Sequence, residues 1–241
     1  MKKLINALGG RRNICFLDFE GTQFSHEMIA YGAVLVTVNS KGEIKTRKKP
    51  IKCYVRAKNK IGKFVEDMTG ISEKMLQEKG ISFSDAIRML KKYCGLHFKN
   101  TTFMTFGNHD MRILGNTVSY NLGAPTDITK VIHKNYIDLQ AVIAEFIKDS
   151  NNNAYSLENY LKVFNISFEG VEHDPEWDAV NLMKLYEAFL KNKDIVLEEY
   201  LKVLMKLSHL PLPIKESVKK LATGQDVTAE EFVEYAKEYI K

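Results

Sequence analysis

The segment that most constrains the fold is residues 13–20, a run of mostly apolar side chains that ends in two carboxylates. A strand that is apolar on both faces is typical of the buried centre of an α/β sheet. Because side chains two apart in a strand point to the same face, Asp18 and Glu20 should project together, in line with Ile14 and Phe16. Buried carboxylates are costly unless their charge is compensated, commonly by a divalent cation with oxygen ligands. We therefore expect half of a metal site at the end of this strand.

The Asp-x-Glu tripeptide alone is weak support for a metal site, because a chain of this composition contains about one by chance. A second one stands at residues 174–176, where the pattern predicts the start of a helix. What distinguishes Asp18 and Glu20 is their position at the end of a buried strand. The metal hypothesis therefore depends on acidic residues elsewhere in the chain.

The 241 residues are enough for one large domain, or for a domain with an appendage. No apolar run approaches the length of a membrane-spanning helix, and no secretory signal follows the N-terminus. The three cysteines, Cys15, Cys53 and Cys94, are widely spaced and form neither a disulfide framework nor a zinc motif. These features predict a cytoplasmic protein that has no membrane partner.

The net charge of +5 is concentrated in one segment. Residues 45–63 contain nine basic side chains and no acidic one, whereas the rest of the chain has 26 basic residues against 30 acidic ones. A local basic surface indicates contact with a polyanion, and we expect Lys48 and Lys49 to follow its phosphates. Lysines on an edge strand can also serve only to prevent the strand from pairing, so both explanations are kept.

The order of strand and helix patterns predicts one mixed α/β sheet, with three antiparallel strands followed by parallel ones and with flanking helices. The strand patterns cover residues 13–20, 28–38, 44–55, 101–106 and 135–138. The helical patterns cover residues 64–68, 72–79, 85–93, 109–120, 139–147 and 156–164, with another from residue 174.

Residues 193–241 contain no strand signal, so we expect a helical extension packed on a domain of residues 1–192. Thr228 and Glu231 form a capping box at the start of its last helix. That helix has an apolar stripe of Phe232, Tyr235, Ala236 and Tyr239. Such a stripe is more often internal packing than an interface, and a protein partner is kept as the alternative.

Three more residues share the sequence context of Asp18 and Glu20. Asp110 stands where the strand 101–106 passes into a helix, and His173 and Asp178 make a His-x4-Asp pair at the start of a late helix. Each of these positions alone has an ordinary explanation, such as an acidic side chain at the positive end of a helix. Their order along the chain is the informative feature.

An Asp-x-Glu at the end of the first strand, an Asp at a middle helix and a His-x4-Asp at a late helix resemble the DEDDh (DnaQ-like) family of 3′–5′ exonucleases. The resemblance covers about residues 12–190 and implies a ribonuclease-H-like fold. Within the family, residues 68–71 and 168–173 look most like the Eri-type exoribonucleases, which trim RNA 3′ ends. No function is carried over to the helical extension.

The resemblance implies that Asp18, Glu20, Asp110 and Asp178 hold two divalent cations and that His173 is the general base. Asp18 would bridge both ions, Glu20 and Asp178 would bind the ion that activates water, and Asp110 would help to hold the second ion. Carboxylates suit Mg²⁺ or Mn²⁺, whereas the sparse histidines and cysteines argue against zinc. The products would be nucleoside 5′-monophosphates.

By the same resemblance, the residues that approach the terminal nucleotide follow Glu20 directly: Gly21, Thr22, Gln23 and Phe24. Gly21 would permit a close approach of the backbone. Phe24 or Met28 would stack on a base, although ordinary core packing explains both residues equally well.

The sequence therefore predicts a metal-dependent 3′–5′ exonuclease that acts on the 3′ end of single-stranded RNA or DNA, with RNA favoured. One alternative is a DNA proofreading or repair exonuclease that docks on a protein partner through the C-terminal helices. Another is a non-catalytic nucleic-acid-binding module on the same fold. The presence of all five expected acidic and histidine side chains weighs against this last class.

Overall fold

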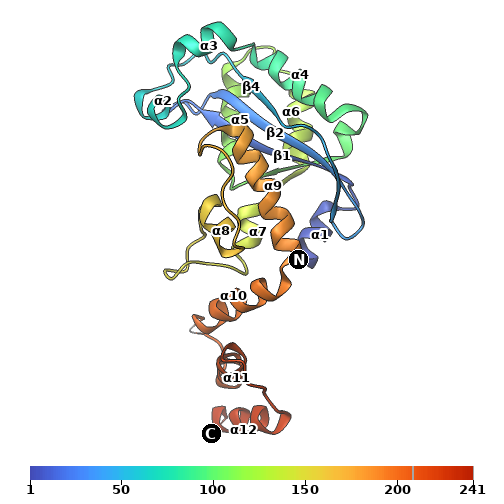
Figure 1. The fold of residues 1–241 in the computed structure, drawn as a ribbon, viewed down its shortest axis with the longest axis vertical. Helices are drawn as coiled ribbons and strands as arrows, with labels where there is room; N and C mark the ends of the chain where they lie inside the picture. The colour runs from blue at the N-terminus through green and yellow to red at the C-terminus, as the bar shows by residue number, and fades with distance from the viewer. Residues whose placement is uncertain (208, 241) are drawn as a thin grey trace.

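The computed structural model describes residues 1–207 and 209–240 (Figure 1). Its sheet contains β1 (Asn13–Gly21), β2 (Met28–Val38), β3 (Ile44–Arg47), β4 (Ile51–Tyr54), β5 (Thr101–Thr105) and β6 (Tyr136–Asp138). The strand order is β3-β2-β1-β5-β6, and β4 also pairs with β2. β1 runs antiparallel to β2 and parallel to β5, which is parallel to β6. The predicted mixed sheet is confirmed.

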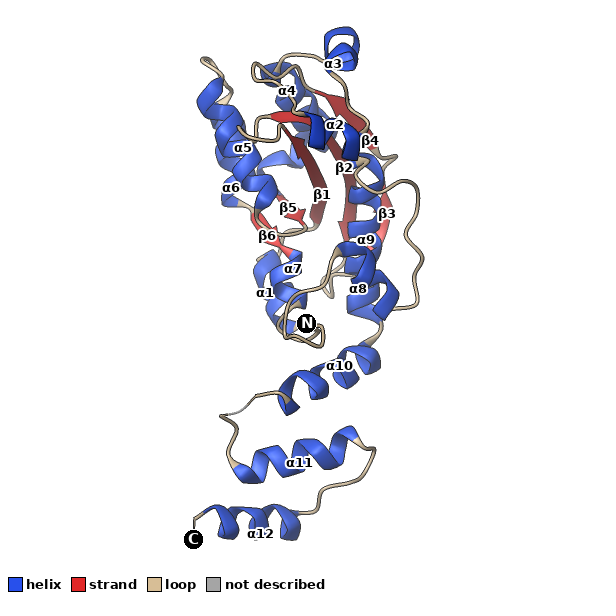
Figure 2. Ribbon diagram, turned by 90° about the vertical axis from the view of Figure 1, so that its left-hand side faces the viewer, coloured by secondary structure: helices blue, strands red, loops and turns tan. Residues whose placement is uncertain are grey.

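The helices cover both faces of this sheet and then continue beyond it (Figure 2). Their bounds are α1 (Lys2–Leu8), α2 (Lys63–Thr69), α3 (Glu73–Lys79), α4 (Phe83–Cys94), a 3₁₀ turn (Gly95–Asn100), α5 (His109–Tyr120), α6 (Thr126–Lys134), α7 (Leu139–Ile143), α8 (Leu157–Val163), α9 (Pro175–Lys191), α10 (Lys193–Met205), α11 (Leu212–Ala222) and α12 (Ala229–Tyr239). None of the described helices combines the length and the hydrophobicity that crossing a membrane requires.

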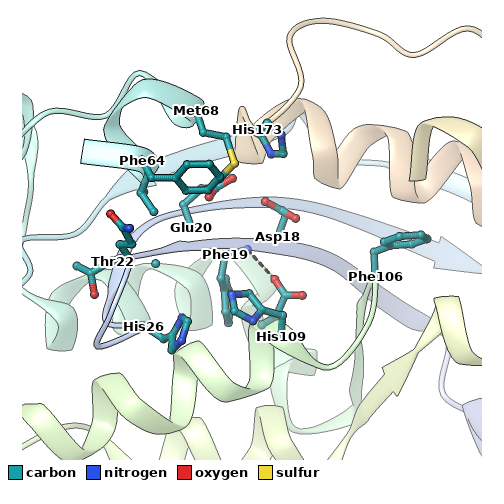
Figure 3. A pocket seen from close by; sticks show the side chains of 14 residues that line it. Asp18, Phe19, Glu20, Thr22, His26, Phe64, Met68, Phe106, His109 and His173 are labelled. Carbon is teal, nitrogen blue, oxygen red and sulfur yellow. Dashed lines mark hydrogen bonds between the residues drawn. The ribbon is translucent and has the colours of Figure 1, made fainter. Parts of the chain in front are cut away.

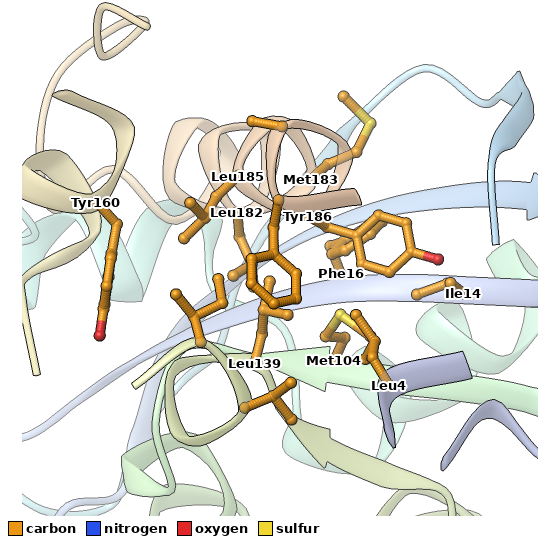
Figure 4. Packing of buried hydrophobic residues seen from close by; sticks show 14 of the residues in the cluster. Leu4, Ile14, Phe16, Met104, Leu139, Tyr160, Leu182, Met183, Leu185 and Tyr186 are labelled. Atoms are coloured by element: carbon orange, nitrogen blue, oxygen red, sulfur yellow. The ribbon is translucent and has the colours of Figure 1, made fainter. Parts of the chain in front are cut away.

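β1 is buried on both faces, as its sequence predicted. Ile14 and Phe16 belong to the apolar cluster on the α9 side, and Phe16 meets Tyr186 of α9 with ring centroids 5.4 Å apart (Figure 4). Cys15 and Leu17 belong to the cluster under α4, α5 and α6. The alternation therefore directs the two carboxylates at the end of β1 toward the α9 side.

The start of α9 lies very close to β2, because the sheet has a glycine at the contact. A Cβ atom on Gly32 would lie 1.8 Å from the carbonyl oxygen of Pro175. Asp174 caps the helix by accepting a hydrogen bond from the backbone N–H of Glu176 at 3.1 Å. These local features fix the point at which α9 crosses the sheet.

The basic segment differs from its prediction, because the single strand expected over residues 44–55 is interrupted. β3 pairs with residues 36–38 of β2, and β4 pairs with residues 30–33. Pro50 stands between the two short strands and has no N–H with which to continue the ladder. The backbone N–H of Lys48 still donates to the carbonyl oxygen of Leu35 in β2 at 2.8 Å, and the ladder resumes in β4.

The C-terminal helices leave the sheet as a row in which successive helices reverse direction (Figure 2). α10 packs on the domain: Val196 belongs to the apolar cluster on the α9 side, and the centroid of the Tyr200 ring lies 5.4 Å from that of Phe146. α11 packs on α10 and α12 packs on α11. The packing expected for residues 193–241 is thus seen for α10, whereas α11 and α12 project beyond the domain.

Candidate active site

A cavity of about 340 Å³ opens where β1 ends (Figure 3). β1 contributes Asp18 and Glu20 to its wall, α5 contributes Asp110, and the loop before α9 contributes His173. The figure shows Phe64 and Met68 of α2 facing Glu20 from another side. Three segments far apart in the sequence therefore bring their polar side chains to one place.

Asp178 completes this cluster from the first turn of α9. Glu20, His173 and Asp178 each offer one possible ligand atom, and these three atoms lie within 4.8 Å of one another. The backbone of His173 lies beside the Asp178 carboxylate and lowers its pKa against the effect of burial. His173 itself is exposed and has a φ of 62°, a left-handed conformation that is uncommon for residues other than glycine, although histidine is enriched in it.

Asp110 has a fixed orientation beside β1. Its Oδ1 atom accepts a hydrogen bond of 2.7 Å from the backbone N–H of Phe19, which is the dashed line in Figure 3. The residue is buried at the start of α5. The strand that presents Asp18 and Glu20 is thus connected directly to the helix that presents Asp110.

Burial raises the pKa of every carboxyl group in the cluster, and the charges of nearby acidic side chains add to the effect. Burial raises the pKa of Asp18 well above its usual range, and the charges of Asp110, Glu20 and Asp178 add to the effect. Burial also raises the pKa of Glu20 to about 8. The pKa values of Asp110 and Asp178 rise to about 7, again mainly through burial.

This donor set fits a divalent cation. The charges of the neighbouring carboxylates raise the pKa of both Asp18 and Glu20, so the site concentrates negative charge, and a bound cation would relieve that repulsion. Carboxylate oxygens are the ligands preferred by Mg²⁺ and Mn²⁺. The ring of His173 is close enough to Glu20 and Asp178 to contact a ligand of the same ion.

The predicted contacts after Glu20 have different outcomes. Gly21 and Gln23 line the cavity. Thr22 also lines it but is fully buried, and its hydroxyl accepts a hydrogen bond of 2.9 Å from the backbone N–H of Glu27. Phe24 is 82% exposed and lies outside the cavity lining. Met28 is completely buried in the cluster under α4 and α5, so its predicted stacking on a base is wrong.

The structure does not bring Lys48 or Lys49 to the cavity. The Lys48 ammonium donates to the carbonyl oxygen of Tyr93 on α4 at 2.9 Å, and the Tyr93 hydroxyl donates to the carbonyl oxygen of Lys49. The structure therefore does not support a contact between these two lysines and the substrate phosphates beside the cavity. The basic segment reaches the cluster through Lys52 instead, whose ammonium donates to Oδ2 of Asp174 at 2.8 Å.

Glu27 holds α2 near the cavity. Its carboxylate accepts hydrogen bonds of 3.0 and 2.9 Å from the backbone N–H groups of Lys58 and Asn59. The backbone N–H of Gln23 donates to the carbonyl oxygen of Ile61 at 2.8 Å. The loop that follows β1 and the loop that leads into α2 are therefore joined as one unit.

Sequence reasoning missed several residues that line the cavity: Phe64, Met68, Phe106, His26 and His109. His26 and His109 meet edge to face, with ring centroids 5.2 Å apart. An aromatic residue at the start of a short helix was the available signal for Phe64. Its exposed fraction of 65%, which marks it as a surface for contact, appears only in the structure.

The comparisons with known proteins agree with this geometry. The family model described as Exonuclease (RNase_T) matches residues 15–186. A search of curated proteins gave no match.

Solved structures of exonucleases share the fold. A 3′-exonuclease studied for its 3′-end specific recognition of histone mRNA stem-loop has a TM-score of 0.60 at 20% identity, over 76% of this chain and 83% of that one. The nuclease domain of 3′hExo, a DEDDh family member bound to rAMP, has a TM-score of 0.59 at 20% identity, over 76% and 94%. Exonuclease I of E. coli in complex with a dA16 oligonucleotide has a TM-score of 0.58 at 15% identity, over 86% and 45%.

The likeness to these structures supports the fold, and the family match spans more than half of the chain. The matched residues include all five positions that the motifs singled out, namely Asp18, Glu20, Asp110, His173 and Asp178. The chain therefore belongs to the Exonuclease (RNase_T) family, in agreement with the resemblance of its motifs to the DEDDh exonucleases.

Proposed function

We propose that the protein removes nucleoside 5′-monophosphates from the 3′ end of single-stranded nucleic acid, with RNA preferred. In this proposal two Mg²⁺ or Mn²⁺ ions are held by Asp18, Glu20, Asp110 and Asp178. The observation that carries the proposal is the gathering of these carboxylates and His173 at the end of β1, on a chain that matches the exonuclease family model.

The four carboxylates would divide the work of holding the ions. The charges of Asp110, Glu20 and Asp178 all raise the pKa of Asp18, and a carboxylate in such surroundings would help to hold both ions. Asp110 would act on the α5 side, with its orientation fixed by the Phe19 N–H. The bound ions would supply Lewis-acid stabilisation of the attacking and leaving oxygens.

His173 would accept the proton of the attacking water. Histidine is the side chain that exchanges a proton near neutral pH, and this one is exposed beside Glu20 and Asp178. His173→Ala is expected to lower turnover by about 10²- to 10⁴-fold and to leave Mn²⁺ binding largely intact. An unchanged kcat would exclude His173 as the base.

Phe64 and Met68 would provide an apolar surface for the terminal base. They line the cavity beside Glu20, and aromatic side chains bind single strands by stacking without strong sequence preference. RNA is favoured because residues 68–71 and 168–173 resemble Eri-type exoribonucleases. The three cysteines are free and buried, and we propose a cytoplasmic location on that ground.

The experiment that tests this function uses RNA and DNA strands of one sequence, each labelled at its 5′ end. We expect a ladder that shortens from the 3′ end with Mg²⁺ or Mn²⁺, releases 5′-monophosphates and stops with EDTA. RNA should be shortened faster than DNA. Internal cuts or shortening from the 5′ end would contradict the proposal, whereas equal rates on both strands would remove only the RNA preference.

A further inference from the structure

An apolar groove of about 590 Å³ lies between α11 and α12, beyond the exonuclease domain. Ile214, Val218 and Leu221 line it from α11 at the i, i+4, i+7 spacing that places side chains on one face of a helix. Phe232 and Val233 line it from α12. Every residue that lines the groove is uncharged, and all except Ser217 and Thr228 are apolar, so the two helices present a largely apolar surface.

This surface is not covered by the described part of the chain. Ile214, Leu221, Phe232 and Val233 are between 42% and 49% exposed, and α12 contains no buried residue. A contiguous apolar patch on a protein surface commonly marks an interaction site. Two antiparallel helices with a shared apolar face form half of a four-helix bundle, and a second pair would complete it.

The charges of the two helices indicate a second copy of the same chain as the partner. α11 has three lysines and one glutamate, a net charge of +2, while α12 has four glutamates and one lysine, a net charge of −3. The opposite charges already meet within one copy, where Lys220 pairs with Glu231. Each helix is therefore complementary to the other helix of an identical hairpin.

The same charges select one geometry. A two-fold axis that runs along the groove places α11 of each copy on α12 of the other, so that opposite charges face each other. A two-fold axis across the groove would place α11 on α11 and α12 on α12, where like charges repel. We propose that this hairpin is a dimer interface in which two copies form a four-helix bundle about an axis along the groove.

The proposed dimer leaves the exonuclease domains free. α12 lies at the far end of the molecule from α2, which closes one side of the cavity (Figure 1). The bundle would therefore join two cavities in one particle without covering either. Two linked sites would raise the effective concentration of the second site for a partner that has two 3′ ends.

The first test measures the molar mass of the full chain by sedimentation across a dilution series. The wild type should be a dimer, and the double variant Leu221→Glu/Phe232→Glu should be a monomer with the same thermal melting of its exonuclease domain. Leu122→Glu is the matched control, because this leucine is fully exposed on the loop after α5, and it should stay dimeric. A wild type that is monomeric throughout would overturn the proposal.

The second test uses charge reversal and leaves the apolar groove unchanged. Lys215→Glu/Lys219→Glu changes the net charge of α11 from +2 to −2, and Glu234→Lys/Glu238→Lys changes that of α12 from −3 to +1. Each double variant then has like charges on both helices and should be monomeric alone. An equimolar mixture should form the heterodimer, because each helix again faces its opposite. A mixture that stays monomeric would overturn the arrangement of α11 on α12.

Discussion

Lys52 connects the basic segment to the carboxylate cluster. Its ammonium donates to Oδ2 of Asp174, and its charge lowers the pKa of Glu20 against the effect of burial. Asp174 caps α9 and directly follows His173. The pair between Lys52 and Asp174 therefore fixes the loop that carries the proposed base.

We expect Lys52→Met to lower kcat by roughly ten- to a hundredfold, because His173 would lose its fixed position relative to the carboxylates. The measurement is kcat and KM on a short single strand. Lys45→Met is the matched control, since Lys45 lies in the same segment and pairs only with Glu43 at 3.7 Å. Full turnover by Lys52→Met would show that the loop holds its position without the ion pair.

The raised pKa values predict how stability depends on pH when metal is removed. In the folded protein the pKa of Glu20 is about 8 instead of 4.5, and the pKa values of Asp110 and Asp178 are about 7 instead of 3.8. At pH values between the unfolded and the folded pKa of each group, the folded state binds more protons than the unfolded state. The free energy of unfolding should therefore fall as pH rises from about 4 to 8.

Denaturant unfolding in EDTA measures this effect, with Glu20→Gln as the comparison. The variant should lose less stability than the wild type across this range, since one titrating group is gone. Added Mn²⁺ should restore stability at pH 8 in the wild type. If the wild type instead becomes more stable from pH 5 to 8 in EDTA, the pKa values of these buried carboxyl groups are not raised in the folded protein.

The sequence was sufficient to place Asp18 and Glu20 on one face of β1, because strand alternation is a local rule. It was not sufficient for Lys52 or Phe64, because their approach to the cavity depends on how β4 and α2 fold back over the sheet. Met28 illustrates the opposite error: it follows the motif closely in sequence, yet β2 turns its side chain into the core.

At the scale of elements, the contact between β2 and α9 positions half of the site. Gly32→Ala would place a Cβ atom 1.8 Å from the carbonyl oxygen of Pro175, so α9 would have to shift and take Asp178 with it. We expect a loss of about 1–3 kcal/mol in stability and a fall in kcat.

Thermal melting and kcat check this prediction together. Gly115→Ala is the control, because a Cβ atom at this position in α5 meets no atom within 4 Å. That variant should keep kcat and gain about 0.5–1 kcal/mol, since alanine favours a helix over glycine. Normal activity in Gly32→Ala would mean that the approach of α9 to β2 does not position the site.

Helix ends were more predictable than strand interruptions and short packed helices. The capping box of Thr228 and Glu231 is present as expected, because both of its hydrogen bonds are local. α6 was not predicted, since its Ile128 and Ile132 are β-branched and favour strands in isolation. Burial of these two side chains against the sheet decides its conformation.

At the scale of the molecule, we propose that the exonuclease unit includes α10. Residues 1–207 should fold, keep full activity and be monomeric, because only α11 and α12 are removed. Residues 1–192 should lose roughly 3–6 kcal/mol, since Val196 and Tyr200 no longer cover the core. Denaturant unfolding of the two truncated proteins distinguishes a domain boundary at residue 207 from one at residue 192. A boundary at residue 192 predicts that both truncated proteins are equally stable.

The likeness of residues 15–186 to other exonucleases could be inferred from the order of five residues, because one fold carries all of them to the same end of β1. The projection of α11 and α12 beyond the domain could not be inferred from the sequence. Amphipathic helices that pack internally and those that bind a partner have the same sequence pattern.

The measurement that tests the central claim most directly compares the wild type with Asp18→Asn on a 5′-labelled single strand in Mn²⁺. Asp18→Asn preserves the shape of the side chain and removes the charge that is central to the cluster. We predict a 3′-shortened ladder for the wild type and a loss of at least about 10³-fold for the variant, at equal thermal stability or better. Activity of Asp18→Asn within tenfold of the wild type would contradict catalysis by metal ions held at the end of β1.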